Sequence, residues 1–367
     1  MKILLLGEYS NMHNTIAEGL RELGHTVTVA SNGDFWKNYP RDIDLQRTMT
    51  KWGTVNFLWR LLKALPKMRG YDVVQIINPV FVEVTPKYIY PIYKYLRKHN
   101  RSMFMCACGM DYYWVKESLN GAFRYGDFNI GKEKRSSSEI DGYIQDYLYG
   151  PKKDLTKYIA KDCDGIISAL YENDVCYRPE YAYKLEFIPE PINLGKITPR
   201  LPHPETDKTR FFIGIQKTRS EYKGTDVMYR CLLRLAEKYP DKVDIVKVES
   251  VPYEEYCRLM DTSDVLLDQL YSYTPSMNSL LAMAKGLVLV GGGEEENYEI
   301  LGETELRPIV NVLPNEDDVY AKLEALVLNL EDVKKRQDES VIYIKRYHDH
   351  LKVAKQYVDF WNKILKA

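Results

Sequence analysis

The sequence NSLLAMAKGLVLVGGGEEE, residues 278–296, joins three kinds of structure within a short space. A helix with a polar start runs into Gly286, and a run of apolar residues then forms a strand. Three glycines and three glutamates follow directly. An apolar run bounded by glycine is typical of a buried strand. A helix that leads into such a strand is the repeating unit of a parallel α/β sheet.

The same alternation continues in both directions along the chain. Five apolar strands are expected in the first half of the chain and five in the second. Their ranges are 2–7, 24–30, 71–77, 101–108 and 163–169, then 210–215, 243–248, 263–269, 286–293 and 307–312. Strands that alternate with helices predict open parallel sheets with helices on both faces, which is a doubly wound α/β architecture.

A proline-rich stretch separates the two series. Five prolines lie within residues 189–209, and neither an interior helix nor a central strand tolerates proline. We therefore expect a first domain at 1–193, a linker at 194–209, a second domain at 210–340 and a helical segment at 341–367. Two open parallel sheets joined in this way form a cleft, because ligands bind at the carboxyl ends of such strands.

Composition and charge exclude several classes of function. The net charge of -1 gives no overall attraction to nucleic acid, so any anion site must be local. The six cysteines lack metal-ligand spacing and are expected to be buried thiols. The start MKILLLGEYS has too short an apolar run for a signal peptide, and no segment has the roughly 18 apolar residues of a spanning helix. We therefore expect a cytoplasmic protein.

Two Asp-x-Asp pairs resemble those of metal-dependent transferases. They are Asp42 with Asp44, and Asp162 with Asp164. Such pairs arise easily by chance, and the second pair lies at the beginning of a strand, away from the edge where ligands bind. No metal site is therefore expected.

Three cations follow the first strand of the second domain. Lys217, Arg219 and Lys223 lie within seven residues, after the strand 210–215 and before Gly224. A nucleoside diphosphate requires cations that stay charged and reach its oxygens, and arginine adds bidentate geometry. The alternative is a solvated charged loop. The position at the carboxyl end of a strand favours phosphate binding.

A helix start supplies a second anion-binding element. Ser276 is placed to cap the helix that begins near residue 277, and Asn278 and Ser279 add side-chain donors. The free first-turn N–H groups and partial positive charge of a helix start attract anions. The alternative is an ordinary capped helix. Together, the cationic loop and the helix start indicate one diphosphate site.

At these residues the sequence resembles the retaining GT-B glycosyltransferases of family 4, also called glycosyl transferases group 1, of bacterial surface-polysaccharide synthesis. The resemblance spans nearly the whole chain and is carried by short motifs. In the second half they are Lys223-Gly224, YCRLMDTSDVLLDQ (256–269), LLAMAKGLVLVGGG (280–293) and HLKVAKQYVDFW (350–361). In the first half they are LRELGHTVTVA (20–30), YDVVQI (71–76), CGMD (108–111) and LEFIPEPIN (185–193).

The resemblance implies two Rossmann-like domains that face a cleft, with a last helix that crosses back to the first domain. It also implies a metal-independent, hexosyltransferase-type enzyme without a cofactor. Such an enzyme transfers sugar, with retention of configuration, from a UDP- or GDP-sugar in the second domain to a glycan or lipid-linked saccharide in the first. Lys223, with Lys217 or Arg219, would neutralise the leaving diphosphate.

The sequence departs from the family at two glutamates. The family's paired glutamates, eight positions apart, fall on Tyr273 and Leu281, and leucine cannot accept a hydrogen bond from ribose. One explanation is that Glu294, Glu295 or Glu296 replaces the missing acceptors, because the preceding glycines, including Gly292 and Gly293, allow close backbone approach. The other explanation is an impaired donor site.

The acceptor side of the resembled fold falls on GEYSNMHN (7–14) and on CGMD. Glu8, Asn11 and His13 are candidate acceptor contacts, and His13 is also a candidate base. Asp111 lies where such enzymes place a polar residue that contacts sugar. The alternatives for the whole protein are a GT-B nucleotide-sugar epimerase and a catalytically inactive relative that acts as a binding partner.

Residues 119–150 interrupt the first series after the strand that ends at residue 108. Because they follow the carboxyl end of a strand, a lid or acceptor loop on the first domain is one interpretation. A solvated surface excursion is the other.

Residues 51–69, KWGTVNFLWRLLKALPKMR, combine an apolar helical face with surrounding basic residues. The apolar positions are Val55, Leu58, Trp59, Leu62 and Leu65, and the basic ones are Lys51, Arg60, Lys63, Lys67 and Arg69. A basic amphipathic helix of this kind lies on anionic membranes, which would place the protein at the inner face of the cytoplasmic membrane. The alternative is a helix that only covers the first sheet.

Overall fold

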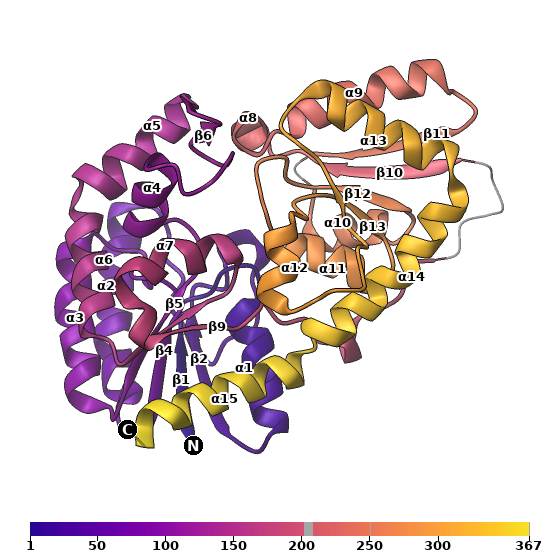
Figure 1. The fold of residues 1–367 in the computed structure, drawn as a ribbon. Coiled ribbons are helices and arrows are strands. Elements are labelled where there is room, and N and C mark those ends of the chain that lie inside the picture. Colours follow the sequence, from indigo (N-terminus) through magenta and orange to yellow (C-terminus); the bar gives the residue numbers. More distant parts are fainter. Residues whose placement is uncertain (202–207, 250, 367) are drawn as a thin grey trace. The chain divides into compact units, whose positions relative to one another are not determined.

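The computed structural model describes residues 1–201, 208–249 and 251–366. The chain divides into two compact units (Figure 1). The first comprises Met1–Glu117, Gly142–Asn193 and His350–Ala367, and the second comprises Ser118–Asp141 and Leu194–Asp349. Pro202 and Pro204 of the predicted linker lie outside the described residues.

The first unit contains a seven-stranded parallel sheet in the order β3-β2-β1-β4-β5-β8-β9. Its strands are β1 Lys2–Leu6, β2 Thr26–Ser31, β3 Ile43–Asp44, β4 Val73–Ile76, β5 Met103–Ala107, β8 Gly165–Ser168 and β9 Leu185–Phe187. Five of them coincide with predicted strands to within two residues at each end. The short strands β3 and β9 were not predicted, because neither has the length of a distinct apolar run.

Helices cover this sheet. They are α1 Met12–Glu22, α2 Lys51–Ala64, α3 Pro86–His99, α6 Pro151–Asp162, α7 Tyr171–Tyr181 and α15 His350–Lys366. Two further helices, α4 Tyr112–Leu119 and α5 Ser138–Ile144, each cross the boundary between the units. The last helix lies against the first one (Figure 1). A Cβ atom on Gly19 would lie 2.6 Å from the carbonyl oxygen of His350, so glycine permits this close approach. Trp361 of α15 is fully buried, and its indole N–H points to Gln75 Oε1 at 3.4 Å.

The second unit contains a five-stranded parallel sheet in the order β11-β10-β12-β13-β14. Its strands are β10 Thr209–Gly214, β11 Val243–Val248, β12 Val265–Leu267, β13 Val288–Gly291 and β14 Val310–Asn311. Its helices are α8 Ser220–Lys223, α9 Thr225–Lys238, α10 Tyr253–Met260, α11 Met277–Lys285, α12 Glu295–Leu301, α13 Glu316–Leu328 and α14 Leu330–Tyr347. The predicted doubly wound α/β architecture is therefore confirmed in both units.

Two segments belong to a different unit than the sequence indicated. Residues 118–141, which include the hairpin of β6 Asn129–Ile130 and β7 Glu133–Lys134, belong to the second unit rather than the first. Residues 341–347 complete α14 of the second unit, so the return to the first unit begins at His350. The first assignment depends on contacts between distant parts of the chain, which local periodicity does not contain. The second follows from where α14 ends, at Tyr347.

The two Asp-x-Asp pairs have structural partners. Asp162 accepts a hydrogen bond from the Tyr93 hydroxyl at 2.9 Å, and Asp164 pairs with the Arg97 guanidinium. Asp42 pairs with Arg21 and Asp44 with Arg41, at 2.8 and 2.7 Å. The cysteines are free thiols, five of them buried.

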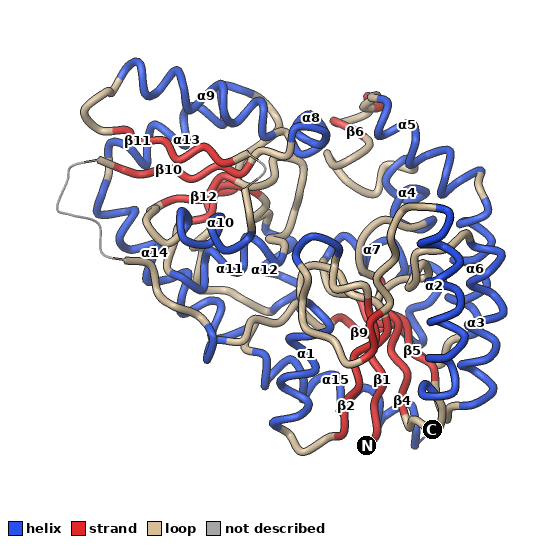
Figure 2. The backbone as a smooth tube through the Cα atoms, turned by 180° about the vertical axis from the view of Figure 1, so that it is seen from behind, coloured by secondary structure: helices blue, strands red, loops and turns tan. Residues whose placement is uncertain are grey.

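Helix α2 uses a different face for packing than the sequence suggested. Phe57, Leu61 and Ala64 are its buried residues, whereas Trp59 and Leu62 of the predicted apolar face are exposed. Figure 2 shows α2 at the outside of the first unit. Among the described residues, none of the helices has the length and apolar character to cross a bilayer.

Candidate functional site

The candidate site lies at the carboxyl edge of the second sheet and includes a loop with several cationic residues. After β10 the chain forms a short 3-10 helix, Lys217–Arg219, and then α8, which ends at Lys223. Gly224 has a φ of +74°, and a Cβ atom there would lie 2.6 Å from Leu270 Cβ. Glycine therefore lets the cationic loop close onto the chain that follows β12, where Leu270 N–H donates to the Lys223 carbonyl at 2.9 Å.

Asp268 lies at the centre of this edge. It follows β12 directly and is 6% exposed. Its carboxylate accepts hydrogen bonds from Ser279 Oγ at 2.5 Å and from Ser276 Oγ at 3.3 Å, and Lys223 Nζ lies 4.0 Å away. Asp268 therefore lies between Lys223, Ser276 and Ser279, three of the residues that the sequence assigned to a diphosphate site. Sequence reasoning missed Asp268, although an acidic residue directly after a buried strand was a visible signal.

The start of α11 faces the same edge. Ser276 has the backbone conformation of an N-cap, but its hydroxyl donates to Asp268 and accepts from Gln269 Nε2 at 3.2 Å. Ser276 is therefore the N-cap residue, as predicted, but its hydroxyl oxygen accepts from Gln269 and makes no hydrogen bond to a first-turn N–H group. Asn278 accepts a hydrogen bond from the Tyr256 hydroxyl at 3.1 Å.

Arg219 has a partner from the segment 118–141. Its Nε donates to Glu139 at 3.2 Å, and its guanidinium lies 4.9 Å from the centre of the Tyr222 ring. Arg135 of the same segment donates to the carbonyls of Glu221 and Tyr222. The segment therefore contacts the cationic loop directly.

The glycines after β13 serve the packing of the unit itself. A Cβ atom on Gly292 would lie 2.6 Å from the Ser272 carbonyl oxygen, and one on Gly293 would lie 2.5 Å from Ile309. The space that a side chain would occupy at these glycines is therefore taken by Ser272 and Ile309. Contact of Gly292 or Gly293 with a ligand stays a prediction, and it would have to use the backbone rather than the Cβ direction.

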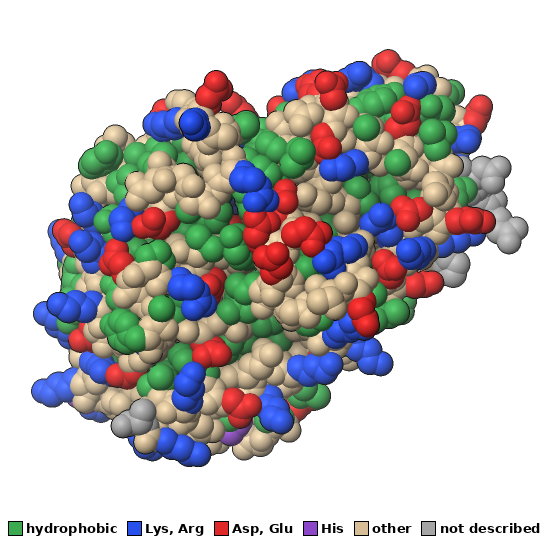
Figure 3. Space-filling model, viewed as in Figure 1, with side chains coloured by type: hydrophobic (Ala, Val, Ile, Leu, Met, Phe, Trp, Pro, Cys, Tyr) green, Lys and Arg blue, Asp and Glu red, His purple; other side chains and the backbone are tan. Residues whose placement is uncertain are grey.

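The three glutamates that follow are already paired. Glu294 accepts from the Tyr125 hydroxyl at 2.5 Å, from Asn311 at 2.8 Å and from Arg124 at 2.9 Å. Glu296 also pairs with Arg124, and Glu295 pairs with Arg307 at 2.8 Å. Figure 3 shows acidic side chains gathered over α12 with basic groups beside them. The prediction that Glu294 or Glu295 accepts ligand hydroxyls remains untested, and Glu294 has little accepting capacity left.

Tyr273, at the first family glutamate position, is a platform for the segment 118–141. It is 2% exposed, and its hydroxyl accepts the Arg124 backbone N–H at 2.7 Å. Its ring centre lies 5.0 Å from that of Tyr125 and 5.6 Å from that of Phe123. Tyrosine in place of glutamate is therefore explained by the docking of this segment. Leu281, at the second position, is partly exposed.

In the first unit, the predicted acceptor-side residues turn inward. Glu8 is 2% exposed and accepts the first-turn backbone N–H groups of His13 at 3.2 Å and of Asn14 at 2.9 Å. Ser10 and Asn11 both have positive φ, 52° and 73°, and this tight turn directs Glu8 at the helix start. Burial outweighs these hydrogen bonds and raises the pKa of Glu8 to about 8.

His13 and Asp111 are fully buried. His13 Nδ1 donates to the Gly7 carbonyl at 2.9 Å, since a carbonyl can only accept, and burial lowers the pKa of His13 to about 4. Asp111 accepts from the Tyr177 hydroxyl and from the Trp114 backbone N–H, and burial raises its pKa to about 6. Both side chains have structural partners, which the isolated motifs did not indicate.

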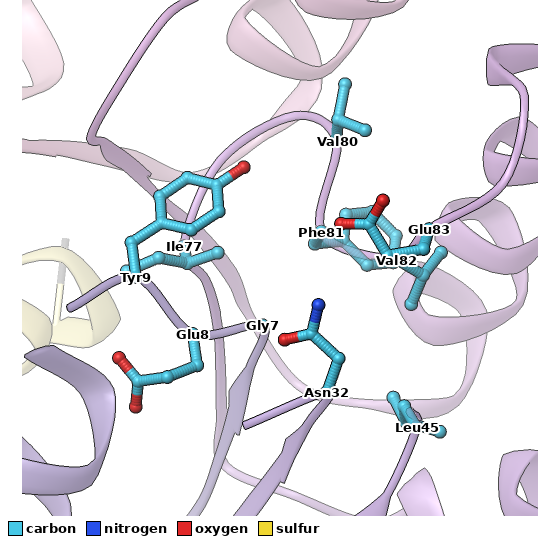
Figure 4. Close-up of a pocket in the computed structure, with 10 residues that line it drawn as sticks. All are labelled: Gly7, Glu8, Tyr9, Asn32, Leu45, Ile77, Val80, Phe81, Val82 and Glu83. Atoms are coloured by element: carbon cyan, nitrogen blue, oxygen red, sulfur yellow. The ribbon is translucent and has the colours of Figure 1, made fainter. Parts of the chain in front are cut away.

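A hollow opens instead beside these residues, at the carboxyl ends of β1, β2 and β4. In Figure 4 the side chains of Tyr9, Asn32 and Glu83 surround it, and the Glu8 carboxylate points away from Asn32 and Glu83. Burial raises the pKa of Glu83. Sequence reasoning missed Asn32 and Glu83, although both follow predicted strands and such ends share one edge of a parallel sheet.

Comparisons by sequence and by structure give different results. No protein-family model matches the sequence, and the search of curated proteins found no match. Solved structures match over the whole chain. A sucrose-phosphate synthase from Thermosynechococcus elongatus has a TM-score of 0.66 at 11% identity and covers 100% of both chains. HepE of Anabaena in complex with UDP-glucose has a TM-score of 0.61 at 11% identity, covering 99% of this chain and 100% of its own.

The chain has the GT-B fold. A further structure with this likeness, from Listeria monocytogenes, carries the name "putative UDP-N-acetylglucosamine 2-epimerase". It has a TM-score of 0.55 at 10% identity and covers 98% of this chain and 94% of its own. At identities this low, the structural likeness establishes the fold alone. The activity has to be argued from the residues of the site.

Proposed function

We propose that this GT-B chain is a glycosyltransferase that uses a nucleoside diphosphate sugar, with UDP-sugars as the first candidates. The observation that carries the proposal is the cluster of Lys223, Asp268, Ser276 and Ser279 at the start of α11. A cation, hydroxyl groups and a helix start together suit a diphosphate. The likeness to HepE, which was solved with UDP-glucose, supports the choice of uridine.

The cluster suits the departure of a diphosphate. In the transfer, the bond between the sugar C1 and the β-phosphate oxygen breaks, and its electron pair stays on that oxygen. A new bond forms from C1 to the oxygen of the acceptor hydroxyl, and the proton of that hydroxyl passes to the leaving phosphate oxygen. Lys223 and the α11 amides would stabilise the charge that develops on the phosphate. Asp268 would hold Lys223 and the two serine hydroxyls in place.

The finer parts of the proposal concern the acceptor and the stereochemistry. We assign the acceptor, a glycan or a lipid-linked saccharide, to the first unit, at the strand ends beside the small hollow around Tyr9, Asn32 and Glu83. Retention of configuration and a role in surface-polysaccharide synthesis follow from the family resemblance. Glu83 and Glu8 are the carboxyl groups among the residues that line the hollow, and burial raises the pKa of each.

Nucleotide binding tests the donor site. Thermal unfolding is measured with UDP, GDP and ADP, and with CMP as a control. A ligand at about a hundred times its Kd stabilises by roughly 2.7 kcal/mol, which raises the Tm by several degrees. We expect one diphosphate to give this shift, and Lys223→Ala and Asp268→Ala to remove most of it. The matched control is Lys238→Ala. Lys238 lies on α9 and forms a surface ion pair with Glu324, so this variant should keep the shift.

Two outcomes would contradict the proposal. One is an absence of stabilisation by any nucleoside diphosphate, which would favour an inactive binding partner. The other is an equal shift in wild type and in Lys223→Ala, which would place the ligand elsewhere. An epimerase is distinguished by its product, because it would return an epimerised sugar without an acceptor, whereas a transferase joins the sugar to one.

A further inference from the structure

The outer face of α2 exposes four large apolar side chains in a row. Trp52, Val55, Trp59 and Leu62 are 84%, 59%, 55% and 66% exposed. They recur every three or four residues and therefore lie along one face of the helix. Scattered exposed apolar residues are common on proteins, but a continuous stripe with two tryptophans marks an interaction surface. We call these four residues the α2 stripe.

The fold does not require the α2 stripe. The opposite face of α2 packs into the unit through Phe57, Leu61 and Ala64, which are 1%, 3% and 8% exposed. The side chain of Thr50 caps the helix by accepting the Gly53 N–H at 2.9 Å. The helix is therefore capped and buried on one side, and its second apolar face remains for a partner.

The charged residues on α2 and directly after it are all basic. Residues 51–71 contain five basic residues and no acidic ones. Lys51, Lys63, Lys67 and Arg69 are exposed, and Arg60 pairs with Asp44 at 3.3 Å. Lys63 Nζ lies 3.4 Å from the centre of the Trp59 ring, so a cation and an aromatic face are presented together.

We propose that the α2 stripe docks the protein on an anionic lipid surface. The two tryptophans and Leu62 would enter the boundary between headgroups and acyl chains, while the lysines reach the headgroup phosphates. A second copy of the chain fits poorly, because a twofold contact places the same basic patch against itself. Protein interfaces are also depleted in lysine. This inference goes beyond the proposed function, since docking requires neither nucleotide nor acceptor.

Vesicle binding tests the proposal on the full-length protein. Wild type is mixed with vesicles of phosphatidylcholine, with and without phosphatidylglycerol, at low and high salt. We expect binding to the anionic vesicles at low salt, a blue shift of tryptophan emission, and weaker binding at high salt. Nucleotide-induced stabilisation in the same samples reports the donor site separately, so failure of one proposal leaves the other standing.

Two sets of variants divide the contributions. The double variant Trp52→Ala, Leu62→Ala should lower the partitioning of the protein onto anionic vesicles by at least about tenfold, because apolar burial in the membrane is lost. Lys51→Gln, Lys63→Gln and Lys67→Gln together should lower it on the order of a hundredfold, at roughly 1 kcal/mol per charge. Tyr183→Ala and Leu328→Ala change side chains that are 76% and 53% exposed elsewhere, and should bind like wild type. All positions are exposed, so an unchanged Tm is expected throughout.

The proposal is overturned by any of three results. The first is that wild type fails to bind anionic vesicles at low salt. The second is that the stripe variants bind these vesicles as well as wild type does. In the third, sedimentation velocity shows self-association that the stripe variants abolish, without vesicle binding, and the α2 stripe is then a contact between copies.

Discussion

Glu8 and His13 lie five residues apart at the start of α1, and burial shifts them in opposite directions. The pKa of Glu8 is raised to about 8, so its carboxyl favours the protonated form. The pKa of His13 is lowered to about 4, so its ring stays neutral. Neither residue is therefore prepared as an exposed acid or base at neutral pH. Both stabilise the turn that carries Tyr9 to the edge of the hollow.

The raised pKa of Glu8 predicts a pH dependence of stability. The folded protein keeps a proton on Glu8 that the unfolded chain, with a pKa of about 4.5, has released. The free energy of unfolding therefore falls as the pH rises from 4.5 through 8. His13 changes its charge only below about 6.5 and Asp111 only up to about 6, so neither contributes between pH 6.5 and 8. The raised pKa of Glu83 acts in the same direction as that of Glu8, and the variant Glu8→Gln separates the two contributions.

Urea unfolding at pH 6.5 and pH 8 measures this effect. We expect wild type to lose about 1 to 2 kcal/mol across the window, at 1.36 kcal/mol per pKa unit. Glu8→Gln cannot titrate and should lose little. A wild-type slope that persists unchanged in Glu8→Gln would assign the dependence to another group.

At the scale of elements, the segment 118–141 explains the unusual residues of the donor unit. Tyr273 replaces a family glutamate because Phe123, Arg124 and Tyr125 pack on it, and Glu294 holds the same segment from the other side. The interpretation of 119–150 as a lid or acceptor loop of the first domain placed residues 119–141 in the first unit, whereas they belong to the second. The contacts that reassign it join residues about 150 positions apart.

Tyr273→Phe tests this docking. The change leaves the Arg124 backbone N–H without its acceptor in a partly buried place, at a local cost of about 1 to 3 kcal/mol. We expect trypsin to cut native protein at Lys132 and Lys134 roughly fivefold to a hundredfold faster, because the segment opens more often. Tyr320→Phe removes another hydroxyl of the same unit, on α13, and should not change the rate. Equal rates in Tyr273→Phe and wild type would show that the segment is held independently of Tyr273.

At the scale of the whole molecule, the described chain passes between the two units four times, at residues 117/118, 141/142, 193/194 and 349/350. The last passage returns α15 to the first unit, where Trp361, Tyr357 and Phe360 join the core of the sheet. All five tryptophans, at 36, 52, 59, 114 and 361, lie in the first unit. Tryptophan fluorescence therefore reports on that unit.

Trp361→Ala tests how far the returning helix stabilises the first unit. Truncation of a fully buried tryptophan costs about 3 to 5 kcal/mol, so the unfolding midpoint followed by the remaining tryptophans should fall markedly. Trp36→Ala removes a side chain that is 64% exposed and should leave the midpoint nearly unchanged. Equal midpoints in both variants would mean that α15 contributes little to the core.

The amino-acid sequence by itself determined the order of strands and helices and the doubly wound class. These follow from local apolar runs such as 2–6 and 288–291, whose burial is encoded within a few residues. The cationic loop and the helix start at 277 were also readable, because each lies at a predicted strand end.

Only the tertiary structure decided which polar residues are used internally. Four polar residues of the candidate motifs are used inside the protein: Glu8, His13, Asp111 and Glu294. Asp111 and Glu294 have partners that are distant in sequence, and Glu8 and His13 are buried by the turn that carries them. Asp268 joined the site for the same reason, since its hydrogen bonds come from the next helix. The exposure of the α2 stripe was likewise undetermined, because periodicity shows that residues share a face but not which face meets the core.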